Sequence, residues 1–112
     1  MGADVDSRDN NHRTPLMWAA KKNQLKCAGI LFDFKASPDL QDIGGNSALH
    51  VACAQGHAAF VTLLLDRGAS LTLCNKQEFA CLEVAAKAGS NDAVMAIAKH
   101  KRLANFIENS SF

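Results

Sequence analysis

Apolar and polar residues follow one another along this chain in a pattern that predicts pairs of short helices. The clearest stretch, Ser47 to Leu65, has a serine, a short apolar segment, a Gly-His corner and a second apolar segment that ends in three leucines. Apolar residues at helical spacing predict one buried face on each segment. Serine is favoured at the start of a helix and glycine at its end. The stretch therefore predicts a helix, a tight turn and a second helix.

The same pattern recurs 33 residues to either side. The recurring positions are Leu16, Leu49 and Leu82, then Ala19, Ala52 and Ala85, then Asn23, Gly56 and Gly89. The period predicts three helix pairs, at 10–35, 36–68 and 69–101. Residues 1–9 match the end of a unit and are interpreted as the tail of a truncated upstream repeat, and 102–112 are expected to form a short helix and a frayed tail.

A 33-residue period whose units begin like T-P-L-H resembles the ankyrin repeat. This resemblance implies an all-α solenoid of three helix-turn-helix repeats joined by hairpin loops, with a short C-terminal helix. Stacks of this kind usually bind proteins or pack against further repeats of their own chain, and few of them catalyse reactions. We therefore expect no enzyme, no cofactor and no metal site.

The residues that define the repeat have structural roles. Thr14 is expected to cap the first helix and Pro15 to occupy its first turn, where a missing N–H costs nothing. In the third unit Ala80 stands in the capping position, which should weaken that helix start by about 1 kcal/mol. The structural repeat positions are Thr14, Pro15, Leu16, Ser47, Leu49, His50, Gly56, Leu82 and Gly89.

Composition narrows the function classes. The formal charge of +1 gives no basic field for nucleic acid, and no apolar run is long enough to cross a membrane. The N-terminus lacks the apolar segment of a signal peptide. Four cysteines without a C-x-x-C pair fit free thiols in a reducing compartment, so we expect a cytoplasmic location.

Three groups of residues could suggest a zinc site, a phosphate-binding loop or an anion-binding patch, but a structural role explains each group better. His50, Cys53 and His57 invite a zinc interpretation, but one short helix and its turn cannot bring them together tetrahedrally. Gly44-Gly45 lacks the rest of a phosphate-binding loop, and a turn explains both glycines. The basic run from Lys99 to Arg102 could meet phosphates or anionic lipid, although cations at the end of a helix are expected from its dipole.

The cysteines differ in their expected exposure. Cys27 and Cys53 lie on predicted apolar helix faces and should resist alkylation. Cys74 lies in a predicted loop near Lys76 and is the candidate reactive thiol, and an ordinary exposed thiol is the alternative.

The last third of the chain resembles a narrower family. Asn75-Lys76-Gln77, Leu82, Ala85-Ala86, Asp92-Ala93-Val94 and the basic run ending at Arg102 are similar to the final ankyrin repeat of TRPA-type cation channels. The resemblance implies a cytoplasmic N-terminal module of a homotetrameric channel gated by irritants or temperature, in which the stack is a scaffold or sensor. Leu103 stands where that family commonly has tryptophan, and no functional residue is carried over.

The alternative is the ankyrin stack of an unrelated intracellular adaptor or scaffold protein, which binds a partner protein on its concave face. Either would use the hairpin tips (Val5 to Arg13, Pro38 to Asn46 and Leu71 to Phe79) and the first-helix face. The sequence beyond Phe112 would separate them, because a channel needs apolar spans there.

The two ends of the stack are expected to behave differently. Leu103, Phe106 and Ile107 are spaced as one helical stripe and should cover the C-terminal end. The first unit carries Leu16, Trp18, Leu25, Ile30 and Phe34, which are not the residues of a polar cap, so the isolated chain is expected to self-associate through this face.

Overall fold

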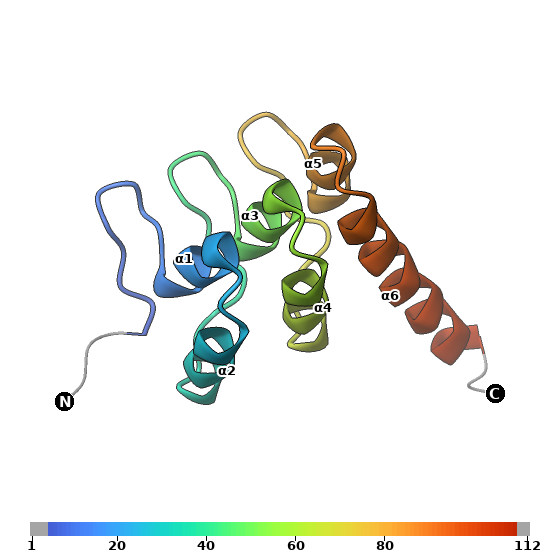
Figure 1. Ribbon diagram of the computed structural model, residues 1–112, viewed down its shortest axis with the longest axis horizontal. Coiled ribbons are helices and arrows are strands. Elements are labelled where there is room, and N and C mark those ends of the chain that lie inside the picture. Colours follow the sequence, from blue (N-terminus) through green and yellow to red (C-terminus); the bar gives the residue numbers. More distant parts are fainter. Residues whose placement is uncertain (1–4, 110–112) are drawn as a thin grey trace.

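The computed structural model describes residues 5–109, and describes side chains up to Lys101. Six helices form three antiparallel pairs (Figure 1). They are α1 (Pro15–Lys22), α2 (Leu25–Asp33), α3 (Ala48–Gln55), α4 (Ala58–Asp66), α5 (Cys81–Lys87) and α6 (Asn91–Asn109). No helix in this described range is long and apolar enough to cross a membrane.

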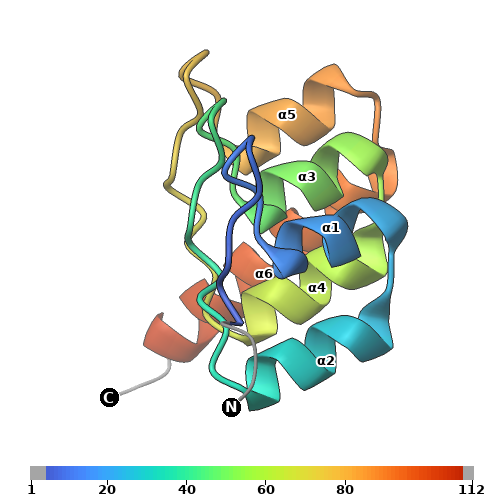
Figure 2. The same cartoon turned by 90° about the vertical axis from the view of Figure 1, so that its left-hand side faces the viewer.

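The helices lie in two layers, and the hairpin loops form a third element along one side (Figure 2). Helices α1, α3 and α5 pack side by side as the inner layer, and α2, α4 and α6 form the outer layer. Each inner helix also packs on the outer helix of its own pair. This is the all-helical stack of three repeats that the 33-residue period predicts.

Small residues let the inner layer pack closely. Ala19, Ala52 and Ala85 occupy the same repeat position and are all buried. Leu16 and Leu49 are buried beside them, whereas Leu82, at the same position of the last pair, is only partly buried. Phe60, Val61 and Leu64 of α4 complete the centre of the core.

The backbone itself repeats. Every residue with positive φ in the described chain belongs to a series with the 33-residue spacing: His12, Gly45 and Glu78; Asn23, Gly56 and Gly89; Lys35 and Gly68. Gly45 needs its missing side chain as well as its φ of +80°, because a Cβ there would lie 2.8 Å from the backbone nitrogen of Lys76. Asn23 and Gly56 end α1 and α3 in the left-handed conformation.

The helix starts show how the repeat positions act. The Thr14 hydroxyl accepts a hydrogen bond from the Met17 N–H at 3.3 Å, and Pro15 is the first residue of α1. Ser47 and His50 form a reciprocal capping box at the start of α3. Ala80 has no side-chain oxygen, but the Glu83 carboxylate accepts the Ala80 N–H at 3.1 Å. The third repeat therefore keeps half of a capping box.

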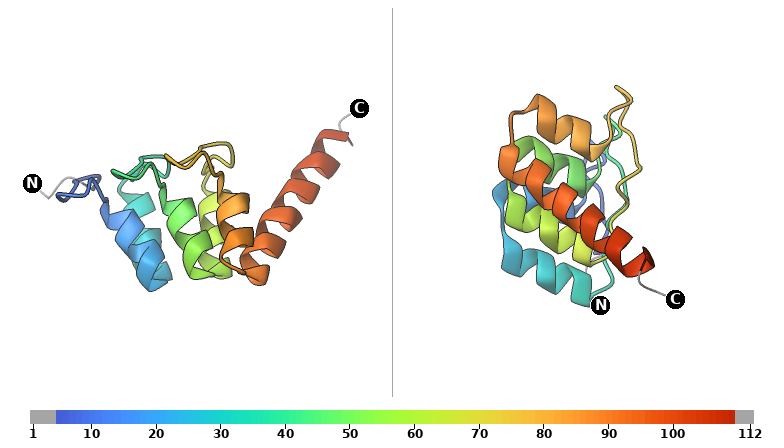
Figure 3. Two further views of the ribbon diagram at one scale, coloured as in Figure 1. Left: turned by 90° about the horizontal axis from the view of Figure 1, so that it is seen from above. Right: turned by 90° about the vertical axis from the view of Figure 1, so that its right-hand side faces the viewer.

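The expectation of a separate short helix at 102–112 is wrong for the backbone. Helix α6 runs without interruption from Asn91 to Asn109; its first part packs on α4 and α5, and its C-terminal part projects away from the stack (Figure 3). No glycine or proline follows Gly89, and the basic run consists of helix-forming residues. The side chains of Leu103, Phe106 and Ile107, which were expected to cover the C-terminal end, lie outside the described residues.

Candidate functional site

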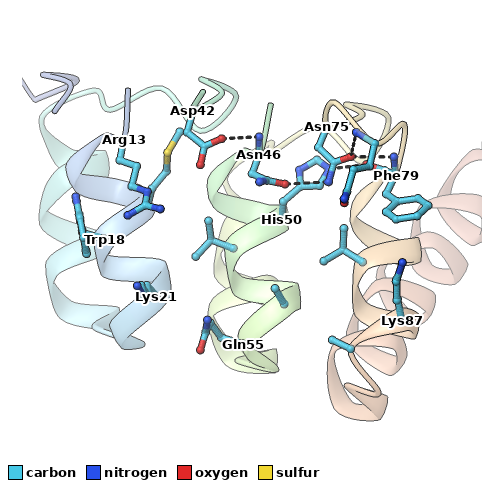
Figure 4. Close-up of a pocket in the computed structure, with 16 residues that line it drawn as sticks. Arg13, Trp18, Lys21, Asp42, Asn46, His50, Gln55, Asn75, Phe79 and Lys87 are labelled. Atoms are coloured by element: carbon cyan, nitrogen blue, oxygen red, sulfur yellow. Dashed lines mark hydrogen bonds between the residues drawn. The ribbon is translucent and has the colours of Figure 1, made fainter. Parts of the chain in front are cut away.

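A groove of about 430 Å³ runs across the inner helices beneath the hairpin loops (Figure 4). The exposed faces of α1, α3 and α5 form its floor, and loop residues that precede each inner helix form its wall. It lies on the hairpin and first-helix surfaces that the sequence favours for binding. Its lining residues are Arg13, Met17, Trp18, Lys21, Asp42, Asn46, His50, Val51, Ala54, Gln55, Asn75, Gln77, Phe79, Val84, Lys87 and Ala88.

The groove is built from the same positions of successive repeats. Residues at one repeat position, just before each inner helix, form a series along the wall. Residues at two positions on the inner helices form two series along the floor, and the second series lies about one helical turn further along each helix than the first. The three series are Arg13, Asn46 and Phe79; Trp18, Val51 and Val84; and Lys21, Ala54 and Lys87. Because equivalent positions of successive repeats line it as one continuous surface, the groove can hold a ligand that extends along the stack.

Each hairpin is fixed by one side chain at its base. Asp42 Oδ1 accepts hydrogen bonds from the backbone N–H groups of Gly44 and Asn46, both at 2.9 Å. Asn75 holds the next hairpin in the same way. The Asn75 side-chain amide also donates to Asn46 Oδ1 at 3.0 Å, which ties the two hairpins together. The groove wall is therefore held by a repeated hydrogen-bond pattern.

Asp9 has the equivalent role in the first hairpin. Its carboxylate accepts the backbone N–H groups of Asn11 and Arg13 and the indole N–H of Trp18. The bond from the Arg13 backbone is the main cause that lowers the pKa of this exposed carboxyl. Asp9 thus orients Trp18 at the N-terminal end of the groove.

His50 joins two repeats beneath the groove. Its Nδ1 accepts the Ser47 backbone N–H at 3.3 Å, and its Nε2 lies 2.9 Å from the Phe79 carbonyl oxygen (Figure 4). A carbonyl can only accept, so Nε2 carries the proton and Nδ1 does not. Because His50 is only 2% exposed, the neutral ring serves as a buried link between α3 and the third hairpin.

Three cations line the groove over aromatic rings. Arg13 and Lys21 lie over the Trp18 ring at 5.3 and 5.4 Å from its centroid. Lys87 lies over the Phe79 ring at 4.9 Å. A cation within about 6 Å of a ring centroid is attracted to the face of the ring. These contacts hold positive charge and apolar surface together at both ends of the groove.

The residues of the zinc interpretation are dispersed among different partners. His50 contacts Phe79, and His57 Nε2 donates to the Lys21 carbonyl at 3.2 Å. The Cys53 side chain contacts that of Cys81 instead. Within the described range, no three histidine, cysteine or acidic side chains are placed to hold a metal ion.

The four thiols fall into a buried pair and two exposed residues. Cys53 and Cys81 are buried across the α3–α5 contact. A hydrogen bond between the two side chains, together with burial, raises the pKa of Cys53. Cys74 is exposed, and its Sγ lies 3.8 Å from the Thr72 carbonyl oxygen.

Cys27 does not lie where the sequence predicted. It is exposed, although it occupies an apolar helix face and its repeat equivalents Phe60 and Ala93 are fully buried. Phe60 and Ala93 lie in α4 and α6, which pack on one another, whereas α2 is the first outer helix of the described residues and has a neighbouring outer helix, α4, on one side. An apolar face shows which side of a helix favours burial, but the face is buried only where another helix packs on it.

A second cavity of about 650 Å³ lies at the N-terminal end of the stack. Trp18, Cys27, Ile30 and Leu31 contribute its apolar lining, and Ile30 is 56% exposed. It lacks the succession of equivalent positions that lines the groove.

Comparison with known proteins agrees with the fold. The profile of ankyrin repeats in three copies matches residues 1–75 and 30–110. The chain therefore belongs to the ankyrin-repeat family.

Several characterised proteins contain a similar stretch. The chain is 45% identical over 69 residues to the 26S proteasome non-ATPase regulatory subunit 10 of Dictyostelium discoideum, which covers 61% of this chain and 30% of that protein. It is 37% identical over 87 residues to the probable palmitoyltransferase AKR2 of Saccharomyces uvarum, covering 78% of the chain and 12% of that protein. Ankyrin repeat domain-containing protein 63 of the mouse is 32% identical over 100 residues, covering 86% and 26%. The chain thus spans less than a third of the length of each of these relatives.

The sequence analysis predicted only part of the groove lining. Phe79 was included as the end of a hairpin tip and Trp18 was assigned to self-association, whereas Lys21 and Lys87 were not named. Lys21 and Lys87 lie 66 residues apart, which is two repeat periods, and this spacing was a usable signal, since exposed residues at one repeat position must line one side of a stack.

Proposed function

We propose that the chain is a non-enzymatic protein-binding module that holds an extended segment of a partner protein in the groove. One observation carries this proposal: equivalent positions of three successive repeats present an uninterrupted lining of aromatic, apolar and charged side chains. Trp18 remains 38% exposed within it. Large aromatic side chains with accessible faces are the residues that most often dominate protein interfaces.

The relatives support a general binding role. Their names describe a proteasome regulatory subunit, a probable palmitoyltransferase and a protein named only for its repeats. The matching stretch is a small part of each, so what they share with this chain is the repeat module. This favours an adaptor or scaffold protein, and the four cysteines support a reducing, cytoplasmic setting.

The finer proposal, a module of a TRPA-like channel, rests on the resemblance of residues 70–110 alone. None of the relatives named above is described as a channel. The adaptor interpretation is therefore the one we put first.

The test is a selection of random linear peptides on the immobilised 112-residue chain, followed by binding measurements on three proteins. Ala54→Tyr places a ring on the groove floor, where Ala54 is exposed. Ala59→Tyr makes the same change at an exposed position of α4, outside the groove, and is the matched control. Circular dichroism melts establish that both variants fold.

The proposal predicts peptides that bind the original chain and Ala59→Tyr equally and that bind Ala54→Tyr at least about tenfold more weakly, a loss of about 1.4 kcal/mol. If every selected peptide binds all three proteins alike, the groove is not the binding surface.

A further inference from the structure

The groove is more positive than the molecule that contains it. Arg13, Lys21 and Lys87 line it against a single carboxylate, Asp42, so it carries two formal positive charges while the whole chain carries one. One oxygen of Asp42 already accepts two backbone N–H groups. The carboxylate is therefore engaged in holding the hairpin and keeps its charge. Asp9 does not line the groove, but its carboxylate lies beside Trp18 and Arg13 and offsets part of the positive charge at the α1 end.

The charges occupy the two ends of the groove. Lys21, Ala54 and Lys87 hold one repeat position, so the lysines flank a small apolar residue. The adjoining repeat position adds Val51 on α3 and Val84 on α5. Arg13 and Trp18 reinforce the charge at the α1 end, and Phe79 lies under Lys87 at the α5 end. Along the floor, Lys21 at one end and Lys87 at the other are separated by the apolar Val51 and Ala54, with the polar Gln55 on the same helix.

The spacing of the helices predicts how far apart the acidic residues of a bound peptide would lie. Packed helices lie about 8–10 Å apart, so the Lys21 and Lys87 positions on α1 and α5 are separated by about 16–20 Å. An extended peptide advances about 3.3 Å per residue. Two carboxylates about five or six residues apart would therefore meet the two lysines while the residues between them cross the apolar centre.

We propose that the groove recognises an extended acidic segment of a partner protein, with Asp or Glu side chains flanking apolar residues. Opposite charges at the two ends select this segment over neutral or basic ones and set its register. Burial of the apolar residues over Val51, Ala54 and Val84 supplies the remaining affinity. This inference rests on the proposed function, because it specifies the partner of the same groove.

Nucleic acid is the competing polyanion, and the groove suits it less. Its phosphates would need a continuous row of cations. Here the cations lie at the two ends of the groove, Val51 and Ala54 separate them, and Asp42 adds a negative charge to the lining.

The experiment uses the groove-dependent peptides of the selection above and reverses charge in the full chain. Lys21→Glu with Lys87→Glu changes the two groove lysines. Lys22→Glu with Lys99→Glu is the matched control, because both residues are exposed and neither lines the groove. Binding is measured by fluorescence anisotropy at about 0.05 and about 0.5 M salt, between which the screening length falls about threefold. A labelled single-stranded oligonucleotide is the comparison probe.

The proposal predicts that groove-dependent peptides are enriched in Asp and Glu on both sides of an apolar centre. Their binding should weaken at least about tenfold in the groove double variant and less than about threefold in the control. Binding should also weaken at the higher salt concentration.

Three outcomes would overturn it. Groove-dependent peptides without acidic enrichment would refute the acidic partner while leaving the proposed function intact. The absence of any groove-dependent peptide would refute both. An oligonucleotide that binds as tightly as the peptides, and is lost in the groove double variant, would assign the groove to nucleic acid.

Discussion

Leucine at one repeat position is buried to different depths along the stack. Leu49 is 1% exposed between two helix pairs, whereas Leu82 is only partly buried in the last pair. We predict that Leu49→Ala lowers the free energy of unfolding by about 2–5 kcal/mol, because it leaves a cavity in the core. Leu82→Ala should cost clearly less. Urea denaturation measures both, and a loss below about 1 kcal/mol for Leu49→Ala would contradict the packing described for α3.

The cysteines provide a second residue-scale prediction. In the native chain, iodoacetamide should label Cys27 and Cys74, because both are exposed, and should spare Cys53 and Cys81. Alkylation needs the thiolate, and burial together with the contact to Cys81 raises the pKa of Cys53. Mass spectrometry after timed labelling locates each adduct, and labelling in denaturant shows that all four can react.

Equal labelling of Cys53 and Cys74 in the native chain would contradict the buried pair. Labelling of Cys74 much faster than a free thiol would instead revive its interpretation as a reactive sensor, which remains a prediction.

Residue patterns anticipate caps and turns better than exposure. The capping role of Thr14 and the left-handed conformation of Asn23 follow from the chemistry of those two residues alone. The exposure of Cys27 depends on whether another helix covers its face, and nothing in the local sequence encodes that neighbour.

At the scale of elements, the third repeat begins with an incomplete cap. Ala80 already has the backbone conformation of a capping residue, with φ −79° and ψ 170°, and Glu83 accepts its N–H. Ala80→Ser would add the missing acceptor and should stabilise the chain by about 1 kcal/mol. The measurement is a thermal or urea melt of the variant.

Ala54→Ser is the control for that change. It introduces the same hydroxyl at an exposed position inside α3, where it should be neutral or slightly destabilising. If Ala80→Ser failed to stabilise the chain, the start of α5 would not be limited by its cap.

Element boundaries were predicted well where a breaker is present and poorly where none is. Asn23 and Gly56 mark the ends of α1 and α3. Beyond Gly89 the sequence contains no glycine or proline, and the basic run from Lys99 to Arg102 was interpreted as the end of a helix. The helix continues there because nothing in the chain stops it.

At the scale of the whole molecule, the repeat period predicts both the stack and the side of it on which the groove lies. The hairpin tips and first-helix face were identified from the period, and the groove lies between them. Lys21 and Lys87 were not predicted because the residues that define the repeat are mostly buried, whereas the exposed positions that line the groove vary from one repeat to the next. Ala54 differs in chemistry from Lys21 and Lys87, and the repeat spacing is what relates the three.

Self-association through the first repeat remains a prediction. Leu25, Ile30 and Phe34 are exposed on α2 or at its end, and Ile30 also lines the larger cavity. Exposed apolar patches of a few hundred Å² tend to find partners. Light scattering over a concentration series should show a mass above that of the monomer, and Ile30→Glu should restore the monomer. Ala59→Glu, on the outer face of α4, should not, and a monomer at every concentration would contradict this prediction.

The central claim is that equivalent positions on α1, α3 and α5 form one binding surface. The most direct test is a titration of the isotopically labelled chain with a selected peptide, followed by amide chemical shifts in nuclear magnetic resonance spectra. We predict that the shifts concentrate at Lys21, Ala54 and Lys87 and their neighbours in the groove, and leave α2 and α4 almost unchanged. Shifts confined to the outer helices, or to the cavity around Ile30, would contradict the account.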